Sequence, residues 1–133
     1  MSKSQRAKGH RFETKVALQF RLAGYPHAVT TRAESKAMDD ALVDITEVGD
    51  WRPQCKSTKV APNMHKLLGE MPQEGDRFGG GINVVLHHRN NEGVTVTMGE
   101  KDFFKIVQRL RNIEEADDMI ARMDDRQNGI SDA

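Results

Sequence analysis

The 133-residue chain is poor in the features that would place it in several common protein classes. Its one cysteine, Cys55, can form no internal disulfide and no cysteine-based zinc site, which fits a reducing compartment. No apolar run approaches the roughly 18 residues of a membrane-spanning helix, and the basic N-terminus is not followed by the apolar segment of a signal peptide. We therefore expect a cytoplasmic protein with no membrane partner.

The chain also lacks net charge, since 20 basic residues balance 20 acidic ones. This average conceals a gradient: residues 1–66 carry 12 basic and 7 acidic side chains, residues 67–112 carry 6 and 6, and residues 113–133 carry 2 and 7. The basic first part is either an electrostatic footprint for DNA phosphates or an ordinary solvated face. The acidic end either folds back on the basic surface, forms a dimer element through Ile113, Ile120 and Met123, or remains disordered.

The length suits one compact domain, and the hydrophobic pattern divides the chain into a flexible basic arm (1–8), a folded domain (9–112) and an acidic helix or tail (113–133). Helical spacing predicts helices over 9–23, 63–71 and 100–111, the last packed on the sheet through Phe103, Phe104, Val107 and Leu110. A short strand is expected over 29–31, a loop over 32–41, a hairpin over 41–48 and 51–58, and two further strands over 82–88 and 94–98. The order α-β-β-β-α-β-β-α predicts an α/β fold with a mixed sheet flanked by helices.

Three polar side chains interrupt the predicted hairpin, whose strands otherwise face the core: Asp44, Gln54 and Lys56. Buried polar groups need partners or a function. Gln54 and Lys56 share one face of their strand, while Cys55 faces the other. Asp44 joins that face only if the hairpin connection has an odd number of residues or a bulge lies near Pro53.

A fourth polar residue, Glu13, lies on the apolar flank of the first helix. Four oxygen donors are available near one another in this prediction: the carboxylates of Glu13 and Asp44, the amide oxygen of Gln54 and the backbone carbonyl of Cys55. Such a donor set suits Mg²⁺, and Mn²⁺ can substitute for it. Lys56 beside such an ion would orient or deprotonate the attacking water, or neutralise charge that develops on a phosphate. The chemistry predicted from these residues is phosphodiester hydrolysis.

The order of Glu13 on a helix, Val43-Asp44-Ile45, and then Gln54-Cys55-Lys56-Ser57 resembles the PD-(D/E)XK nuclease superfamily, and most of all its archaeal-type and phage-type Holliday junction resolvases. The resemblance spans residues 8–111 and implies a restriction-endonuclease-like core. It also implies a metal-binding aspartate at Asp44, a catalytic lysine at Lys56 and a helix glutamate at Glu13. Gln54 stands where the family usually carries Glu or Asp, which removes one negative charge from the metal site. If a phage encodes the chain, the compartment is the host cytoplasm.

The resemblance further implies a Mg²⁺-dependent endonuclease for branched DNA, such as four-way junctions, that acts as a homodimer because two incisions need two sites. The residues expected to contact DNA are Lys8, Arg11, Lys15, Arg32, Ser35, Lys36, Ser57 and Lys59. The alternatives are another nuclease of the superfamily, either nicking or a recombination exonuclease, and a catalytically silent DNA-binding module.

Other patterns in the chain are interpreted as structural. In the simplest alternative, Asp44 and Lys56 form a cross-strand ion pair and Glu13 is a solvated helix residue. The run Gly79-Gly80-Gly81 lacks the Gly-Lys-Ser/Thr ending of a phosphate-binding loop, so no nucleotide cofactor is expected. The five histidines have no metal-ligand spacing, although His65 is a weak candidate for a phosphate contact.

Overall fold

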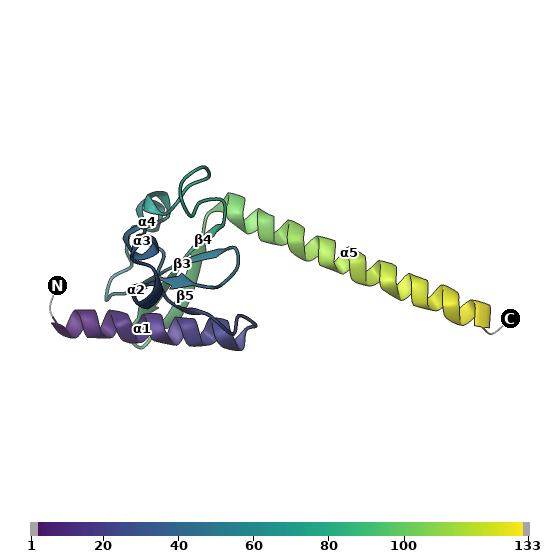
Figure 1. Cartoon of the computed structure of the whole chain (residues 1–133), viewed down its shortest axis with the longest axis horizontal. Coiled ribbons are helices and arrows are strands. Elements are labelled where there is room, and N and C mark those ends of the chain that lie inside the picture. The colour runs from purple at the N-terminus through teal and green to yellow at the C-terminus, as the bar shows by residue number, and fades with distance from the viewer. Residues whose placement is uncertain (1–2, 132–133) are drawn as a thin grey trace. The chain divides into compact units, whose positions relative to one another are not determined.

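A computed structural model describes the backbone of residues 3–131 and the side chains through residue 128. The fold is mixed α/β, with a three-stranded mixed sheet and a small two-stranded one accompanied by helices (Figure 1). The elements are α1 (Lys3–Leu22), β1 (Val29–Thr30), α2 (Thr31–Glu34), α3 (Lys36–Asp40), β2 (Ile45–Thr46), β3 (Trp51–Ser57), α4 (Met64–Glu70), β4 (Ile82–Arg89), β5 (Gly93–Met98) and α5 (Glu100–Ser131). The predicted order is confirmed, except that two short helices occupy the segment expected to be a loop.

The first helix is longer than its apolar pattern indicates. Phe12, Val16 and Ala17 are buried at helical spacing, and Gly24 with a φ of 121° ends the helix as predicted. The helix begins at Lys3, however, so residues 3–8 are helical where the sequence predicted a flexible arm. The error has a simple cause: these residues are exposed and polar, and helical periodicity of apolar residues cannot detect a turn that buries nothing.

The main sheet has the order β3-β4-β5, with β3 parallel to β4 and β4 antiparallel to β5. The two strands predicted over 82–88 and 94–98 are confirmed as β4 and β5. The predicted pairing of residues 41–48 with 51–58 is wrong: β2 pairs with β1, with Thr30 opposite Ile45, and β3 pairs in parallel with β4, with Gln54 opposite Val85. Local turn signals favoured the nearest strand, whereas burial on both faces favours the parallel partner.

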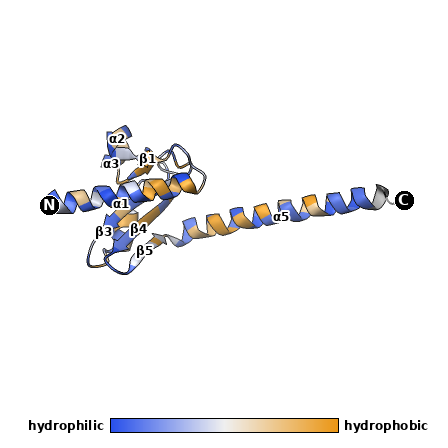
Figure 2. Cartoon of the chain, turned by 90° about the horizontal axis from the view of Figure 1, so that it is seen from below, coloured by the Kyte–Doolittle hydropathy of each residue, from blue (hydrophilic) through white to orange (hydrophobic). Residues whose placement is uncertain are grey.

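The core lies between α1 and the strands. Phe12, Val16 and Ala17 of α1 pack with Ile45 and Val48, and the side chain of Cys55 belongs to the same cluster. The C-terminal half of α1 and much of β4 are orange, hence hydrophobic, in Figure 2. Since Cys55 faces this core, Gln54 and Lys56 lie on the opposite face of β3, as predicted.

Residues 100–131 form one continuous helix, α5, and constitute a compact unit separate from residues 1–99. The predicted boundary between residues 112 and 113 is therefore wrong, because the helix passes through it without a break. The packing of Phe103, Phe104, Val107 and Leu110 on the sheet stays a prediction, because the helix and residues 1–99 are separate units. Within the described part of the chain, no helix combines the length and the hydropathy needed to cross a membrane.

Candidate functional site

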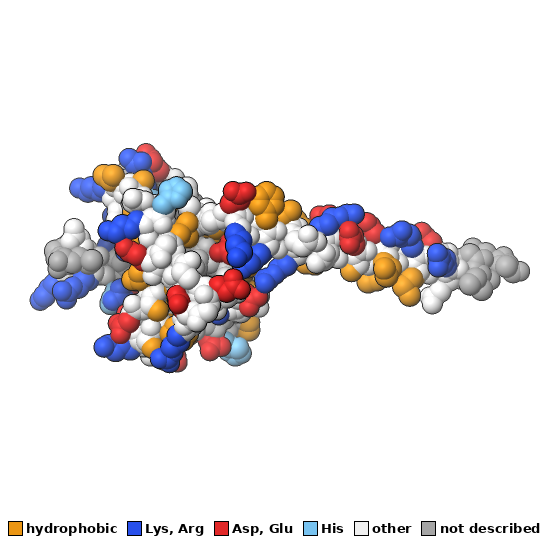
Figure 3. Space-filling view, turned by 90° about the horizontal axis from the view of Figure 1, so that it is seen from above, with side chains coloured by type: hydrophobic (Ala, Val, Ile, Leu, Met, Phe, Trp, Pro, Cys, Tyr) orange, Lys and Arg blue, Asp and Glu red, His pale blue; other side chains and the backbone are white. Residues whose placement is uncertain are grey.

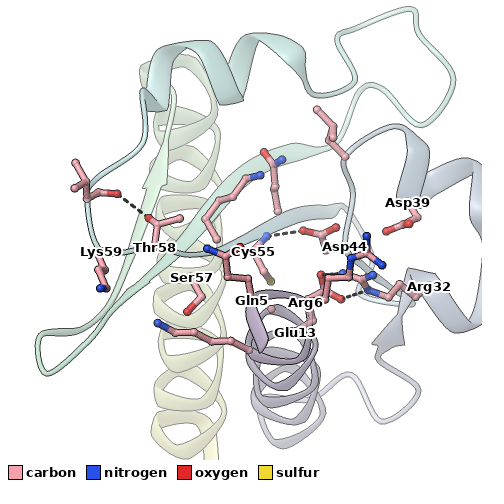
Figure 4. Close-up of a pocket in the computed structure, with 16 residues that line it drawn as sticks. Gln5, Arg6, Glu13, Arg32, Asp39, Asp44, Cys55, Ser57, Thr58 and Lys59 are labelled. Atoms are coloured by element: carbon pink, nitrogen blue, oxygen red, sulfur yellow. Dashed lines mark hydrogen bonds and ion pairs between the residues drawn. The ribbon is translucent and has the colours of Figure 1, made fainter. Parts of the chain in front are cut away.

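A cleft of about 970 Å³ lies beside the N-terminal half of α1, α2, the segment before β2, and β3 with its continuation (Figure 4). It brings together all four predicted catalytic residues, although they are spread over 44 positions of the sequence. Sixteen residues line it: Gln5, Arg6, Lys8, Gly9, Glu13, Arg32, Asp39, Leu42, Asp44, Gln54, Cys55, Lys56, Ser57, Thr58, Lys59 and Val60. The geometry of the acidic centre is set by three local arrangements.

The first arrangement fixes Asp44 through Thr31, the fully buried first residue of α2. The Thr31 hydroxyl donates to the Val43 carbonyl at 2.6 Å, and its backbone N–H donates to the Asp44 carbonyl at 2.9 Å. On its other side Asp44 donates its backbone N–H to the Pro53 carbonyl at 2.7 Å. Asp44 is thereby held between α2 and β3.

The side chain of Asp44 reaches across to β3. Its Oδ2 accepts the backbone N–H of Cys55 at 2.7 Å, where a regular antiparallel strand would supply a carbonyl (Figure 4). This contact and the backbone bond from Asp44 to Pro53 join the two segments without the hairpin in which a bulge was predicted. Among the residues described, no ion pair within 4 Å joins Asp44 to Lys56, so the simple cross-strand pair is not formed.

The carboxyl of Asp44 has a strongly altered protonation equilibrium. Burial raises its pKa from 3.8 to about 6, outweighing the hydrogen bond from Cys55, which lowers it; the nearby carboxylate of Glu13 adds to the increase. A carboxylate in such surroundings gains most from a cation, because the cation offsets the lost solvation of the negative charge. The pKa of the Cys55 thiol is also raised by burial, which rules out a nucleophilic role near neutral pH.

The second arrangement is a bidentate ion pair between α1 and α2. Arg32 Nε donates to Glu13 Oε2 at 2.9 Å and Arg32 Nη2 donates to Oε1 at 3.0 Å (Figure 4). The Glu13 side chain is 7% exposed and that of Arg32 is 43% exposed. The hydrogen bonds to Glu13 raise the pKa of Arg32, so the guanidinium stays charged. Glu13 is therefore buried rather than solvated, and both of its oxygens are occupied by a cationic side chain.

The third arrangement concerns Gln54, which is 2% exposed on the cleft face of β3. Its Oε1 is the one buried side-chain oxygen or nitrogen without a hydrogen-bond partner among the residues that the structure describes. An orphaned buried oxygen costs about 1–3 kcal/mol, so a position that keeps one calls for an explanation. Lys56 lies two residues along the strand, on the same face and half-buried.

These groups fit a hard divalent cation in part. The cleft offers oxygens from Glu13, Asp44 and Gln54, which are the donor types that Mg²⁺ and Mn²⁺ prefer. Among the described residues, no group of three or more His, Cys, Asp or Glu side chains is placed to hold a metal ion. The Cys55 backbone carbonyl stays a predicted ligand, its N–H being bound by Asp44.

Basic residues surround the acidic centre: Arg6, Lys8, Arg32, Lys56 and Lys59 line the cleft. Of the predicted DNA contacts, Lys8, Arg32, Ser57 and Lys59 lie there, whereas Arg11, Lys15, Ser35 and Lys36 are not among the lining residues. Ser35 instead caps α3 by accepting the Met38 backbone N–H at 3.3 Å. Lys36 pairs with Asp40 on the same short helix at 3.8 Å.

No protein-family model, curated protein or solved structure matches this chain. The resemblance to PD-(D/E)XK nucleases consequently rests on the sequence motifs alone.

The sequence reasoning missed several lining residues, among them Gln5, Thr58 and Val60. Gln5, Gly9 and Glu13 follow one another at intervals of four, which places them on one face of α1. Continuing the helix back to Lys3 would have revealed this face. Thr58 and Val60 follow β3 and carried no comparable signal.

Two of the five histidines, His87 and His88, have structural surroundings. His87 is buried on β4, and its Nε2 lies 2.7 Å from the Thr58 hydroxyl, which itself donates to the Val60 carbonyl. Because that hydroxyl has one proton, His87 is the donor in this pair. The Nδ1 of His88 is 3.1 Å from the Ser57 hydroxyl. The two histidines therefore hold the end of β3, and His65 is not among the lining residues.

Proposed function

We propose that this protein is a metal-dependent DNA endonuclease of the PD-(D/E)XK type that hydrolyses phosphodiester bonds. The observation that carries the proposal is the buried, unpartnered Oε1 of Gln54 in the same cleft as the desolvated carboxyl of Asp44. Without a cation, both groups are costly to bury. With one, they become ligands.

Asp44, Gln54 and Glu13 would hold Mg²⁺ or Mn²⁺. A cation in that position supplies Lewis-acid polarisation of a phosphate oxygen and lowers the pKa of a bound water. Asp44 is pre-positioned by Thr31 and Cys55, so its carboxylate need not reorganise to serve as a ligand. Glu13 joins only after Arg32 releases its oxygens.

Two cationic side chains of the cleft would act on the substrate directly. The ammonium of Lys56, fixed on a strand, would stabilise the negative charge that grows on the scissile phosphate or orient the attacking water. Arg32, once displaced from Glu13, presents a fork of donors that matches a phosphate. Arg6, Lys8 and Lys59 at the same cleft would bind flanking phosphates without reading sequence.

For the substrate, we propose branched DNA, with four-way junctions as the leading candidate. Each chain carries one acidic cleft with these residues, and resolving a junction takes two symmetric incisions, so a homodimer is the working form.

The decisive experiment incubates the full chain with labelled four-way junction, linear duplex and single-stranded DNA, each with Mg²⁺, Mn²⁺ or EDTA. We expect cleavage of the junction in Mg²⁺ or Mn²⁺ and none in EDTA. Cleavage of linear duplex at the same rate would replace the resolvase by another nuclease of the superfamily. Cleavage that persists in EDTA would overturn the metal site.

One observation favours a second candidate, a catalytically silent DNA-binding module. The bidentate contact of Arg32 with Glu13 already neutralises one of the carboxylates that a metal needs. This candidate predicts junction binding without cleavage in either metal.

The two candidates differ in the response to Arg32→Ala. If the site binds metal, removing a competing cation and freeing Glu13 should tighten Mn²⁺ binding by about tenfold, measured by calorimetric titration. The metal-free variant should be destabilised, by about 1–2 kcal/mol after allowance for the exposure of Arg32, and Mn²⁺ should restore its stability.

Lys36→Ala is the matched control, because Lys36 forms an exposed ion pair outside the cleft and its loss should change neither quantity measurably. Weaker Mn²⁺ binding by Arg32→Ala would show that Arg32 supports the site rather than competing for it.

A further inference from the structure

Taken by itself, the α5 unit leaves an unusual amount of its apolar surface uncovered. Eight of its large apolar side chains are between 41% and 59% exposed: Phe103, Phe104, Val107, Leu110, Ile113, Met119, Ile120 and Met123. Hydrophobic and hydrophilic residues alternate along the α5 ribbon in Figure 2, and hydrophobic and charged side chains are interspersed on it in Figure 3. Because a helix gains most of its stability from packing an apolar face, this one requires a covering partner.

Part of this surface follows a heptad pattern. Phe103, Ile106, Leu110, Ile113, Asp117, Ile120 and Asp124 succeed one another at alternating intervals of three and four. We refer to these residues as the α5 seam. Five of the seven are apolar, and an interval that averages 3.5 residues keeps them on one side of two supercoiled helices. The seam therefore fits another helix of similar length.

Charge along α5 indicates which helix this is and how it runs. Residues 100–112 contain four basic and two acidic side chains, whereas residues 113–131 contain two basic and six acidic ones. In a parallel pair of α5 helices, Asp117 and Asp124 would each face their own copy within the seam, which is repulsive. An antiparallel pair places the acidic half of each helix beside the more basic half of the other.

We infer that α5 pairs with α5 of a second copy of this chain in an antiparallel coiled coil. When Leu110 lies beside the partner's Ile113, Phe103 lies beside the partner's Ile120. In this register Asp117 lies beside the partner's Ile106, within about one turn of the partner's Arg109. The arrangement is two-fold symmetric and self-complementary, as a closed dimer requires. It does not depend on the proposed nuclease activity.

The first test measures the mass of the full chain by sedimentation over a range of concentrations. We expect a dimer, and we expect Leu110→Glu combined with Ile113→Glu to raise its dissociation constant by roughly 100-fold or more, because two charges enter the apolar seam. Gln108→Glu with Asn112→Glu adds the same charge on the outer face, where these two side chains bond each other at 3.0 Å. That control should remain dimeric.

Two results would overturn the inference at this stage. A monomeric wild-type chain would mean that the seam is covered within the chain, for instance by the exposed Val94 and Val96 of β5. A dimer that survives the seam substitutions with unchanged affinity would mean that another surface holds it. Thermal unfolding of each variant establishes that residues 1–99 remain folded.

The second test determines the orientation. A spin label on Ala121→Cys, in a Cys55→Ala background, reports the distance between the two labels of a dimer. In the antiparallel register residue 121 lies beside the partner's residue 102, so the two labels are separated by roughly 30 Å along the axis. A parallel pair brings them within about 20 Å. The shorter distance would refute the antiparallel arrangement.

Discussion

Asp44→Asn is expected to lower metal-dependent cleavage by about 1,000-fold or more and, in the same protein, to increase the stability of the metal-free fold at pH 8. The loss of activity follows because the amide is neutral and cannot replace a charged ligand. The gain in stability follows because the ionised carboxyl of Asp44 is disfavoured by burial.

The sign of the pH dependence follows from the raised pKa. Asp44 has a pKa of about 6 in the folded protein against 3.8 without the fold, so the folded state binds the proton more tightly. This contribution to stability is complete at acidic pH and is lost as pH rises through about 6. The shift corresponds to at most about 3 kcal/mol, and asparagine avoids the loss while its Oδ1 still accepts the Cys55 N–H.

Urea unfolding without metal at pH 3, which is below both pKa values, and at pH 8 measures the change in stability. Asp44→Asn should match the wild type at the lower pH and exceed it at the higher one. Asp39→Asn is the comparison variant, since Asp39 is the cleft carboxylate not assigned to the metal. Its charge adds only a minor part to the raised pKa of Asp44, so its gain in stability at pH 8 should be clearly smaller. Destabilisation of Asp44→Asn at pH 8 would mean that the Asp44 carboxylate serves the fold, and full cleavage by this variant would remove it from the site.

Lys56→Ala is expected to reduce the cleavage rate by about 100-fold to 1,000-fold while leaving Mn²⁺ binding intact or tighter. The reason is that Lys56 contributes a positive charge that is useful when charge develops on the phosphate but unfavourable to a neighbouring cation. Single-turnover cleavage and calorimetric titration separate the two quantities.

Lys59→Ala is the matched control, because Lys59 is an exposed lysine of the same cleft beyond the end of β3. Loss of Lys59 should weaken DNA binding and make that binding less dependent on salt, by about as much as one phosphate contact contributes. The cleavage rate of bound DNA should change little. If Lys56→Ala lost metal binding, or if the two variants lost cleavage equally, Lys56 would have no special part in the chemistry.

Much of the candidate site could be predicted from the sequence because its polar side chains stand in segments whose other residues are apolar. Asp44, Gln54 and Lys56 interrupt segments whose neighbours are buried, and Glu13 lies beside Phe12 on a helix flank. Such conflicts between burial and polarity are visible without a structure. Strand geometry alone also predicts that Gln54 and Lys56 share one face of their strand.

The partner of each strand and of Glu13 could not be predicted in this way. The sequence favoured a hairpin between residues 41–48 and 51–58, but the fold pairs β3 with β4 across 24 intervening residues. Likewise, nothing in the spacing of Glu13 and Arg32 indicates a bidentate contact, because that contact depends on where α2 begins. Pairings between distant segments are decided by the burial of whole surfaces, which local propensity does not encode.

Sequence alone therefore determined which residue types are available: carboxylates, an amide and a lysine in otherwise apolar segments, with basic residues early in the chain and acidic ones late. The tertiary structure alone decided that they meet in one cleft, that Arg32 occupies Glu13, and that Gln54 keeps an oxygen without a partner. The physical reason is that composition and periodicity are local properties, whereas desolvation and ion pairing depend on which segments exclude water from one another.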